Sequence, residues 1–185
     1  MPPSTQRYVA LLRAINVGGH TVKMDALRKY FAKMGFTNVE TFIASGNVIF
    51  DAKERDAAAL EERISLELEK VLGYEVGTFV RTPTELDAVV RHEAFARDVI
   101  DPAKHTLYVG FLASSPTKET TRGVLALRTP VDEFHIHRRE LYWGCRTRFS
   151  DSQVKAPVLA RALGVPMTVR NITTVRKLAE KYGSG

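Results

Sequence analysis

Two hydrophobic periodicities divide the first half of the chain into strands and helices. Near-continuous apolar residues over 8–15, interrupted by Arg13, predict a strand that is covered on both faces. Apolar residues at helical spacing over 24–34 and 60–72 predict two amphipathic helices. Three further strands are predicted at 39–44, 48–50 and 75–81. This order, strand-helix-strand-strand-helix-strand, is that of a ferredoxin-like βαββαβ unit.

The second half of the chain repeats the same order of elements. Its strands are predicted at 106–112, 133–137, 141–144 and 166–170, with apolar helical segments between them. We therefore predict an α+β protein made of two tandem ferredoxin-like (βαββαβ) units with antiparallel sheets. The mixed, loop-like stretch 91–102 contains the predicted boundary, which divides the chain into 1–92 and 93–185. Asn171 is expected to cap a last helix in the second unit.

Turn-forming residues follow the first and second strands of the first unit. The first strand continues into Asn16-Val17-Gly18-Gly19, and the second ends in Ser45-Gly46-Asn47. The pair Gly46-Asn47 predicts a two-residue hairpin turn. Because the first two strands of a βαββαβ unit run parallel, they end at one edge of the sheet, and we expect the two loops to approach each other. The first helix also begins at this edge, where it offers free backbone N–H groups.

Cationic and polar side chains at this edge suit an anionic small ligand such as a phosphate or a nucleotide. Arg13 and Lys23 supply positive charge close to the turn residues. The predicted ligand-binding residues are Arg13, Asn16, Gly18, Gly19, Lys23, Ser45, Gly46 and Asn47, with Arg170 and Asn171 as further candidates. The glycines and asparagines equally fit tight turns and helix caps, so a purely structural reading stays open.

Motifs for catalysis or metal binding are weak in this sequence. The paired glycines match neither a Walker loop nor a dinucleotide fingerprint. Ser45 lacks the flanks of a nucleophile elbow, so no catalytic residue is assigned. His135 and His137 share a face of a predicted strand and could bind a metal together with His105, although this spacing is a poor zinc pattern. We predict no structural metal and no cofactor.

Charge and composition limit the classes of partner. Lysine and arginine number 27 against 21 acidic residues, a net charge of +6, but the two signs are interspersed. Weak, salt-sensitive nucleic-acid binding is one alternative, although the RNP1 pattern is absent, and a protein-interaction module without chemistry is another. No apolar run is long enough to span a membrane, and no signal peptide is visible. The single cysteine, Cys145, fits a reducing compartment, so we expect a cytoplasmic protein without a membrane partner.

Several motifs together resemble one known family. They are Arg13-Ala14-Ile15-Asn16-Val17-Gly18-Gly19, Lys23-Met24, Phe42-Ile43-Ala44-Ser45-Gly46-Asn47-Val48-Ile49-Phe50, and Thr168-Val169-Arg170-Asn171 with Thr174 and Leu178. This set is similar to the bacterial domain-of-unknown-function family 1697. The resemblance implies tandem ferredoxin-like domains and assigns no catalytic residue. Members often carry Trp-Asn after the Arg-Asn pair, whereas Ile172 and Thr173 follow it here.

Overall fold

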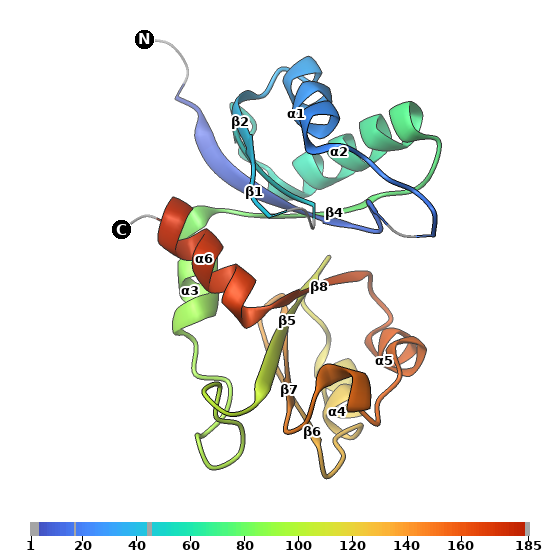
Figure 1. Cartoon of the computed structure of the whole chain (residues 1–185), viewed down its shortest axis with the longest axis vertical. Helices are drawn as coiled ribbons and strands as arrows, with labels where there is room; N and C mark the ends of the chain where they lie inside the picture. Colours follow the sequence, from blue (N-terminus) through green and yellow to red (C-terminus); the bar gives the residue numbers. More distant parts are fainter. Residues whose placement is uncertain (1–3, 17, 44–45, 184–185) are drawn as a thin grey trace. The chain divides into compact units, whose positions relative to one another are not determined.

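The computed structural model describes residues 4–16, 18–43 and 46–183. Ser45 therefore lies outside the described residues. The chain divides into two compact units. Unit 1 comprises Met1–Asp87 with Tyr182–Gly185, and unit 2 comprises Ala88–Lys181. Each unit contains one four-stranded antiparallel sheet (Figure 1).

Unit 1 has the predicted βαββαβ order. Its elements are β1 (Gln6–Arg13), α1 (Met24–Lys33), β2 (Thr37–Thr41), β3 (Asn47–Ala52), α2 (Ala57–Leu72) and β4 (Gly77–Arg81), and α3 (Pro83–Arg91) follows. The strands lie in the order β2-β3-β1-β4, and all neighbours are antiparallel. Since β3 lies between β1 and β2 and is antiparallel to both, β1 and β2 run parallel, as predicted.

Unit 2 repeats this arrangement, which confirms the predicted duplication of fold. Its elements are β5 (Thr106–Leu112), α4 (Lys118–Leu125), β6 (Asp132–His137), β7 (Glu140–Cys145), the 3-10 helix η1 (Phe149–Asp151), α5 (Ala156–Leu163), β8 (Met167–Asn171) and α6 (Ile172–Tyr182). The strand order β6-β7-β5-β8 is equivalent to that of unit 1. The last helix α6 carries the chain back into unit 1 at its C-terminal end.

In unit 1 the strand β1 is buried on both faces. Tyr8 and Leu12 point to the face that α1 and α2 cover, and they pack there with Phe31 of α1. Val9 and Leu11 alternate to the other face and are also fully buried. This double burial explains the near-continuous apolar pattern of the strand, and it shows that the β1 part of the sheet offers no exposed face.

Local hydrogen bonds shape the start of α3 and the connection before β3. Thr82 and Glu85 form a capping box at the start of α3: the Glu85 carboxylate accepts from the Thr82 N–H at 2.7 Å, and the Thr82 hydroxyl accepts from the Glu85 N–H at 3.2 Å. The prediction of a two-residue hairpin turn at Gly46-Asn47 is wrong. Asn47 is the first residue of β3, and its carbonyl accepts from the Phe42 N–H at 3.0 Å. The ladder therefore closes at Phe42 and Asn47, so the connection between β2 and β3 is longer than two residues.

Candidate functional site

The structure brings the β1–α1 loop and the β2–β3 loop of unit 1 into contact. The Leu12 N–H donates to the Gly46 carbonyl at 2.9 Å. A Cβ atom on Gly46 would lie 2.8 Å from Cγ2 of Ile15, so the two loops approach as closely as a glycine allows. We name these segments the paired loops, residues 14–23 and 42–46. Their contact follows from the parallel direction of β1 and β2.

Asn16 in the first of the paired loops and Asn47, the residue that follows the second, both have structural partners. The Asn16 Oδ1 atom accepts from the Val22 N–H at 2.8 Å and so ties the start of its loop to the end. Asn47 is fully buried, and its Nδ2 atom donates to the Phe42 carbonyl at 2.9 Å. Asn47 therefore shapes the turn from inside, whereas Asn16 is exposed and faces solvent.

Left-handed backbone conformations gather in the paired loops. They occur at Ala14, Gly18, Gly19, Ile43 and Gly46, with φ between 57° and 83°. A β-branched residue such as Ile43 adopts this region only at an energetic cost, and its side chain is also 46% exposed. Strained residues of this kind concentrate at binding and catalytic sites, because only the surrounding structure can hold them.

The cationic residues of the candidate site lie at different places along this edge. Lys23 is the exposed N-cap residue of α1, and it makes no side-chain capping hydrogen bond to any part of the chain that the structure describes. Arg13 is exposed at the end of β1. A Cβ atom on Gly77 of β4 would lie 3.3 Å from the Arg13 Nε atom. Arg13 thus extends over β4, on the side of β1 away from β3 and the 42–46 loop.

The further candidates Arg170 and Asn171 belong to unit 2. The Asn171 Oδ1 atom accepts from the Thr173 N–H at 2.9 Å, which confirms that Asn171 caps α6. Arg170 is buried and donates to the Thr168 hydroxyl at 2.8 Å and to the Val169 carbonyl at 3.0 Å. Burial lowers the pKa of Arg170 to about 10.

Arg81 of unit 1 is the counterpart of Arg170, and sequence reasoning missed it. Both arginines stand near the end of the last strand of their sheet, and both donate to the carbonyl of the preceding residue. Arg81 is buried, and its Nη1 atom lies 3.7 Å from a Glu61 carboxylate oxygen. The repeated pattern of a strand-end arginine before a capped helix was the signal that could have identified it.

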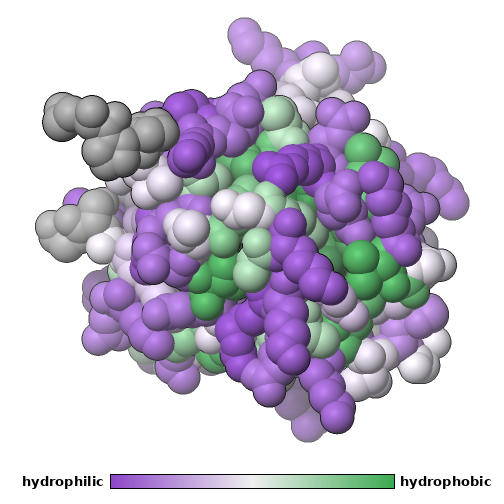
Figure 2. All heavy atoms as spheres, turned by 90° about the horizontal axis from the view of Figure 1, so that it is seen from above, coloured by the Kyte–Doolittle hydropathy of each residue, from purple (hydrophilic) through white to green (hydrophobic). Residues whose placement is uncertain are grey.

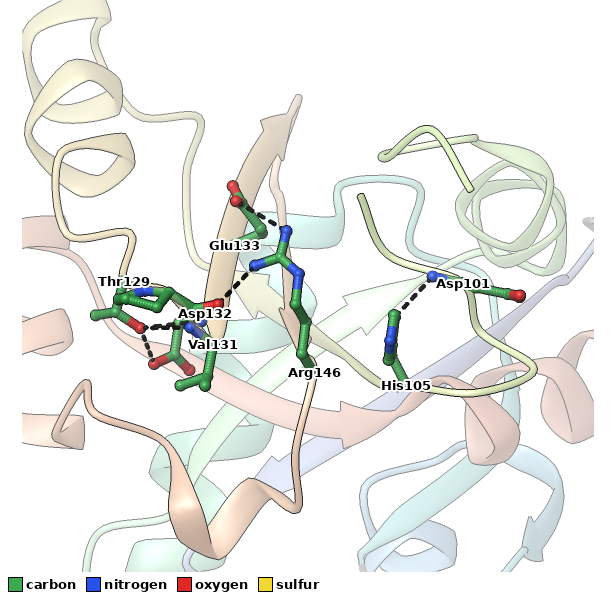
Figure 3. Close-up of polar contacts among 8 residues, drawn as sticks. Asp101, His105, Thr129, Val131, Asp132, Glu133 and Arg146 are labelled. Carbon is green, nitrogen blue, oxygen red and sulfur yellow. Dashed lines mark hydrogen bonds and ion pairs between the residues drawn. The ribbon is translucent and has the colours of Figure 1, made fainter. Parts of the chain in front are cut away.

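The sequence allowed a weak metal pattern of His135 and His137 with His105, and the described residues contain no such three-residue metal group. The His105 Nδ1 atom accepts from the Asp101 N–H at 3.0 Å within its own turn (Figure 3). His92, which follows α3, joins the pair instead: its Nε2 atom lies 2.9 Å from that of His135, and its ring stacks on His137 with centroids 4.1 Å apart. Within the described residues, no group of three or more His, Cys, Asp or Glu side chains is arranged to hold a metal ion.

Burial and neighbouring rings lower the pKa values of two members of this cluster, His92 and His135. Burial, with smaller contributions from His137 and His135, lowers the pKa of His92. Burial and then His137 lower the pKa of His135. A hydrogen bond between two imidazole rings also needs one nitrogen without a proton, so the pair is stable only while at least one ring is neutral.

A buried carboxylate organises the start of β6 in unit 2. Asp132 accepts from Trp143 Nε1 at 3.0 Å, from the Ser152 hydroxyl at 2.7 Å and from the Thr129 hydroxyl at 2.8 Å (Figure 3 shows the Thr129 contact). The Gln153 N–H donates to it at 3.0 Å. Burial acts to raise the pKa of Asp132, but these hydrogen bonds outweigh it and lower the pKa. All four donors are neutral, so this network serves stability.

The hydropathy of the surface and of the helices bears on docking surfaces and on membrane spans. Figure 2 shows a mainly hydrophilic face on which hydrophobic residues are interrupted by hydrophilic ones, so this face carries no continuous apolar docking surface. None of the helices in the described ranges has the length and apolar character to cross a membrane.

Comparison with known proteins identifies the family. The sequence pattern of the family described as "Protein of unknown function (DUF1697)" matches residues 5–142. The chain belongs to the DUF1697 family. The match contains both paired loops, whereas the resemblance noted at 168–171 lies beyond it. A solved structure, described as that of the conserved bacterial protein SP0830 from Streptococcus pneumoniae, is similar with a TM-score of 0.71 and 24% identity, covering 97% of this chain and 99% of that one. At that identity the similarity shows the fold. Comparison with curated proteins gives no match.

Proposed function

We propose that this DUF1697 protein binds a small anionic ligand, a phosphate or a nucleotide-like molecule, at the paired loops of unit 1. The site would be formed by the exposed loop backbone at Gly18 and Gly19, the start of α1 and the charge of Lys23. Arg13 adds positive charge at the neighbouring end of β1 and β4. Asn16, Gly46 and Asn47 would act indirectly, because they hold the loops in shape. Arg170 and Asn171 are better explained as structural residues of unit 2.

The difference between equivalent loops in the two units carries this proposal. Unit 2 makes the same strand-to-helix connection with residues 113–117, about half the length of 14–23 in unit 1. It makes the hairpin between β6 and β7 with only Arg138 and Arg139, against residues 42–46 in unit 1. The fold itself therefore does not need the length of the paired loops, although Arg138 in the unit 2 hairpin also has a left-handed φ of 55°. Extra length of this kind is retained when loops carry function.

The N-terminal ends of the equivalent helices α1 and α4 also differ between the two units. In unit 2 the Thr117 hydroxyl caps α4 by accepting from the Thr120 N–H at 3.1 Å. In unit 1 the N-cap position of α1 is Lys23, which cannot accept such a bond and carries a positive charge. An uncapped helix start beside a lysine favours an anion, since backbone N–H groups and the helix dipole both attract negative charge.

Nucleic-acid binding through an open sheet face is less well supported. That mode needs aromatic side chains exposed on the sheet for base stacking. Tyr8 of β1 and Phe79 of β4 are 1% and 2% exposed, and Phe50 of β3 is fully buried. A protein-interaction module would need a continuous exposed apolar patch, which the face in Figure 2 does not offer.

Titration of phosphate and nucleotides, followed by calorimetry and by backbone amide NMR, tests the proposal. We expect saturable binding that shifts the amide signals of Gly18, Gly19 and residues 24–26. Lys23→Gln should weaken binding by about tenfold, as expected for the loss of one charge-assisted contact. Lys33→Gln, a change of the same kind in the last turn of α1, is the matched control and should bind normally.

Thermal melts of both variants accompany the titration. Lys23 and Lys33 are exposed, so each substitution should change the free energy of unfolding by less than about 0.5 kcal/mol. The proposal is overturned if the wild-type protein binds nothing in the panel, or if Lys33→Gln weakens binding as much as Lys23→Gln does.

A further inference from the structure

Unit 2 contains a cavity of about 300 Å³ beside the segment that follows α3. This volume is at the lower end of the range found for small-molecule sites. One wall is the segment 90–97, and the opposite parts come from β5, β7 and α6. The sequence suggested only a linker at 91–102, so the cavity was not foreseen.

The floor of the cavity is apolar and firmly held. Ile100, Leu107 and Ile172 line it and are at most 8% exposed. Ile100 packs directly on Gly144 of β7, where a Cβ atom would lie 2.5 Å from its Cγ1 atom. The Tyr142 hydroxyl donates to the Val89 carbonyl at 3.0 Å, which fixes the end of α3 against β7. A floor held by a close packing contact and a buried hydrogen bond is formed before any ligand arrives.

The rim of the cavity is strongly basic. Arg91 at the end of α3, Arg97 in the following segment and Arg176 of α6 all line it, together with His92. These three arginines form no ion pair with an acidic residue in the described parts of the chain. Glu93 is the one acidic residue among the lining side chains, so positive charge predominates. Arginine side chains that converge without carboxylate partners are suited to bidentate binding of a carboxylate or phosphate group.

We infer that this cavity is a second, separate binding site, which takes a small organic oxyanion with a compact apolar body, such as an aromatic carboxylate or phosphate ester. The apolar body would lie on Ile100, Leu107 and Ile172, and the oxyanion would face the arginines. The volume limits the body to about one ring. This site lies within unit 2 and does not depend on the paired loops of unit 1.

Methyl NMR with defined probes tests the inference. The probes are benzoate, phenyl phosphate and benzamide, of which the last has the shape of benzoate without its charge. We expect benzoate or phenyl phosphate, or both, to shift the methyl signals of Ile100, Leu107 and Ile172 in a saturable way, and the tighter probe identifies the preferred oxyanion. Benzamide should leave these signals almost unchanged, because its neutral amide cannot replace the oxyanion at the arginines.

Variants of the rim complete the test. Arg97→Gln and Arg176→Gln should each weaken binding of the charged probe by about tenfold. Arg161→Gln, on the exposed part of α5 in the same unit, is the control and should have no effect. The methyl spectra without probe show that each variant is folded. The inference is overturned if neither charged probe shifts the three methyl groups, if benzamide shifts them equally, or if the rim variants bind as the control does.

Discussion

The two units have sheets of the same topology, but their long loops and polar networks lie at different places. In unit 1 these features lie in the paired loops at one edge, which include the exposed Gly18 and Gly19 and end at Lys23, the N-cap residue of α1 without a side-chain capping bond. In unit 2 the equivalent loops are short and the helix start is capped by Thr117. There these features lie in the segment 92–105 and in the network around Asp132. A duplicated fold thus leaves each copy free to develop a different part of its surface.

Both units share one structural feature at the end of the last strand. Each last strand carries a buried arginine, Arg81 or Arg170, that donates to the carbonyl before it, and each is followed by a capped helix. Because this feature recurs where the loops differ, it belongs to the fold. The features found in only one unit are therefore the better candidates for function.

The largest expected effect is a difference in stability loss between removing a carboxylate in unit 2, Asp132, and removing one in unit 1, Asp51. Asp132→Ala should lower the free energy of unfolding by about 3–5 kcal/mol, because it leaves several buried donors without an acceptor. Asp51→Ala in unit 1 removes a partly exposed ion pair with Arg7, 2.8 Å long, and should have an effect of about 1 kcal/mol or less. Urea unfolding measures both. Fluorescence of Trp143, the single tryptophan, follows unit 2, and hydrogen exchange follows unit 1. Equal effects would mean that the Asp132 network is not specially important.

A second comparison tests the contact between the paired loops. Gly46→Ala should destabilise unit 1 by about 2–4 kcal/mol, since it combines a left-handed φ of 81° with a Cβ atom only 2.8 Å from Ile15. Gly73→Ala is the matched control: its φ is 79°, but nothing lies within 4 Å of the added atom. Its effect should be about 1 kcal/mol. Hydrogen exchange of β1 and β3 measures both, and an equal loss in the two variants would contradict close packing of the loops.

The smallest expected effect is a pH dependence confined to unit 2. The pKa values of His92 and His135 are lowered in the folded protein, so the unfolded chain binds more protons just below the ordinary histidine pKa of about 6.5. The free energy of unfolding should therefore be highest above that pH and fall as the pH drops through 6.5 toward the lowered values. Urea unfolding followed by Trp143 fluorescence at about pH 7.5, 6.5 and 5.5 measures this slope.

Matched variants decide whether the histidine cluster is the cause. The double variant His92→Gln with His135→Gln should flatten the dependence over this range, because it removes both groups that take up protons on unfolding. His20→Gln, in the 14–23 loop of unit 1, lies outside the cluster and should leave the slope unchanged. A slope that persists in the double variant would assign the effect to other groups.

Hydrophobic periodicity along the chain was sufficient for the order of elements, the antiparallel βαββαβ units and the parallel direction of β1 and β2. These follow from local patterns, because each buried face must recur with the period of its own helix or strand. The caps at Thr82 and Asn171 were equally readable, since a cap involves only neighbours in sequence. The convergence of the two loops could be inferred as well, because strand direction alone places them at one edge.

Only the tertiary structure decided which side chains lie together across long distances in sequence. It placed the Arg13 side chain next to Gly77 and buried Asn47 beside the turn. It grouped His92, rather than His105, with His135. It also formed the cavity beside the segment after α3 from residues that the sequence separates widely. Side-chain direction and enclosure depend on the packing of every neighbouring element at once, and no local pattern contains that information.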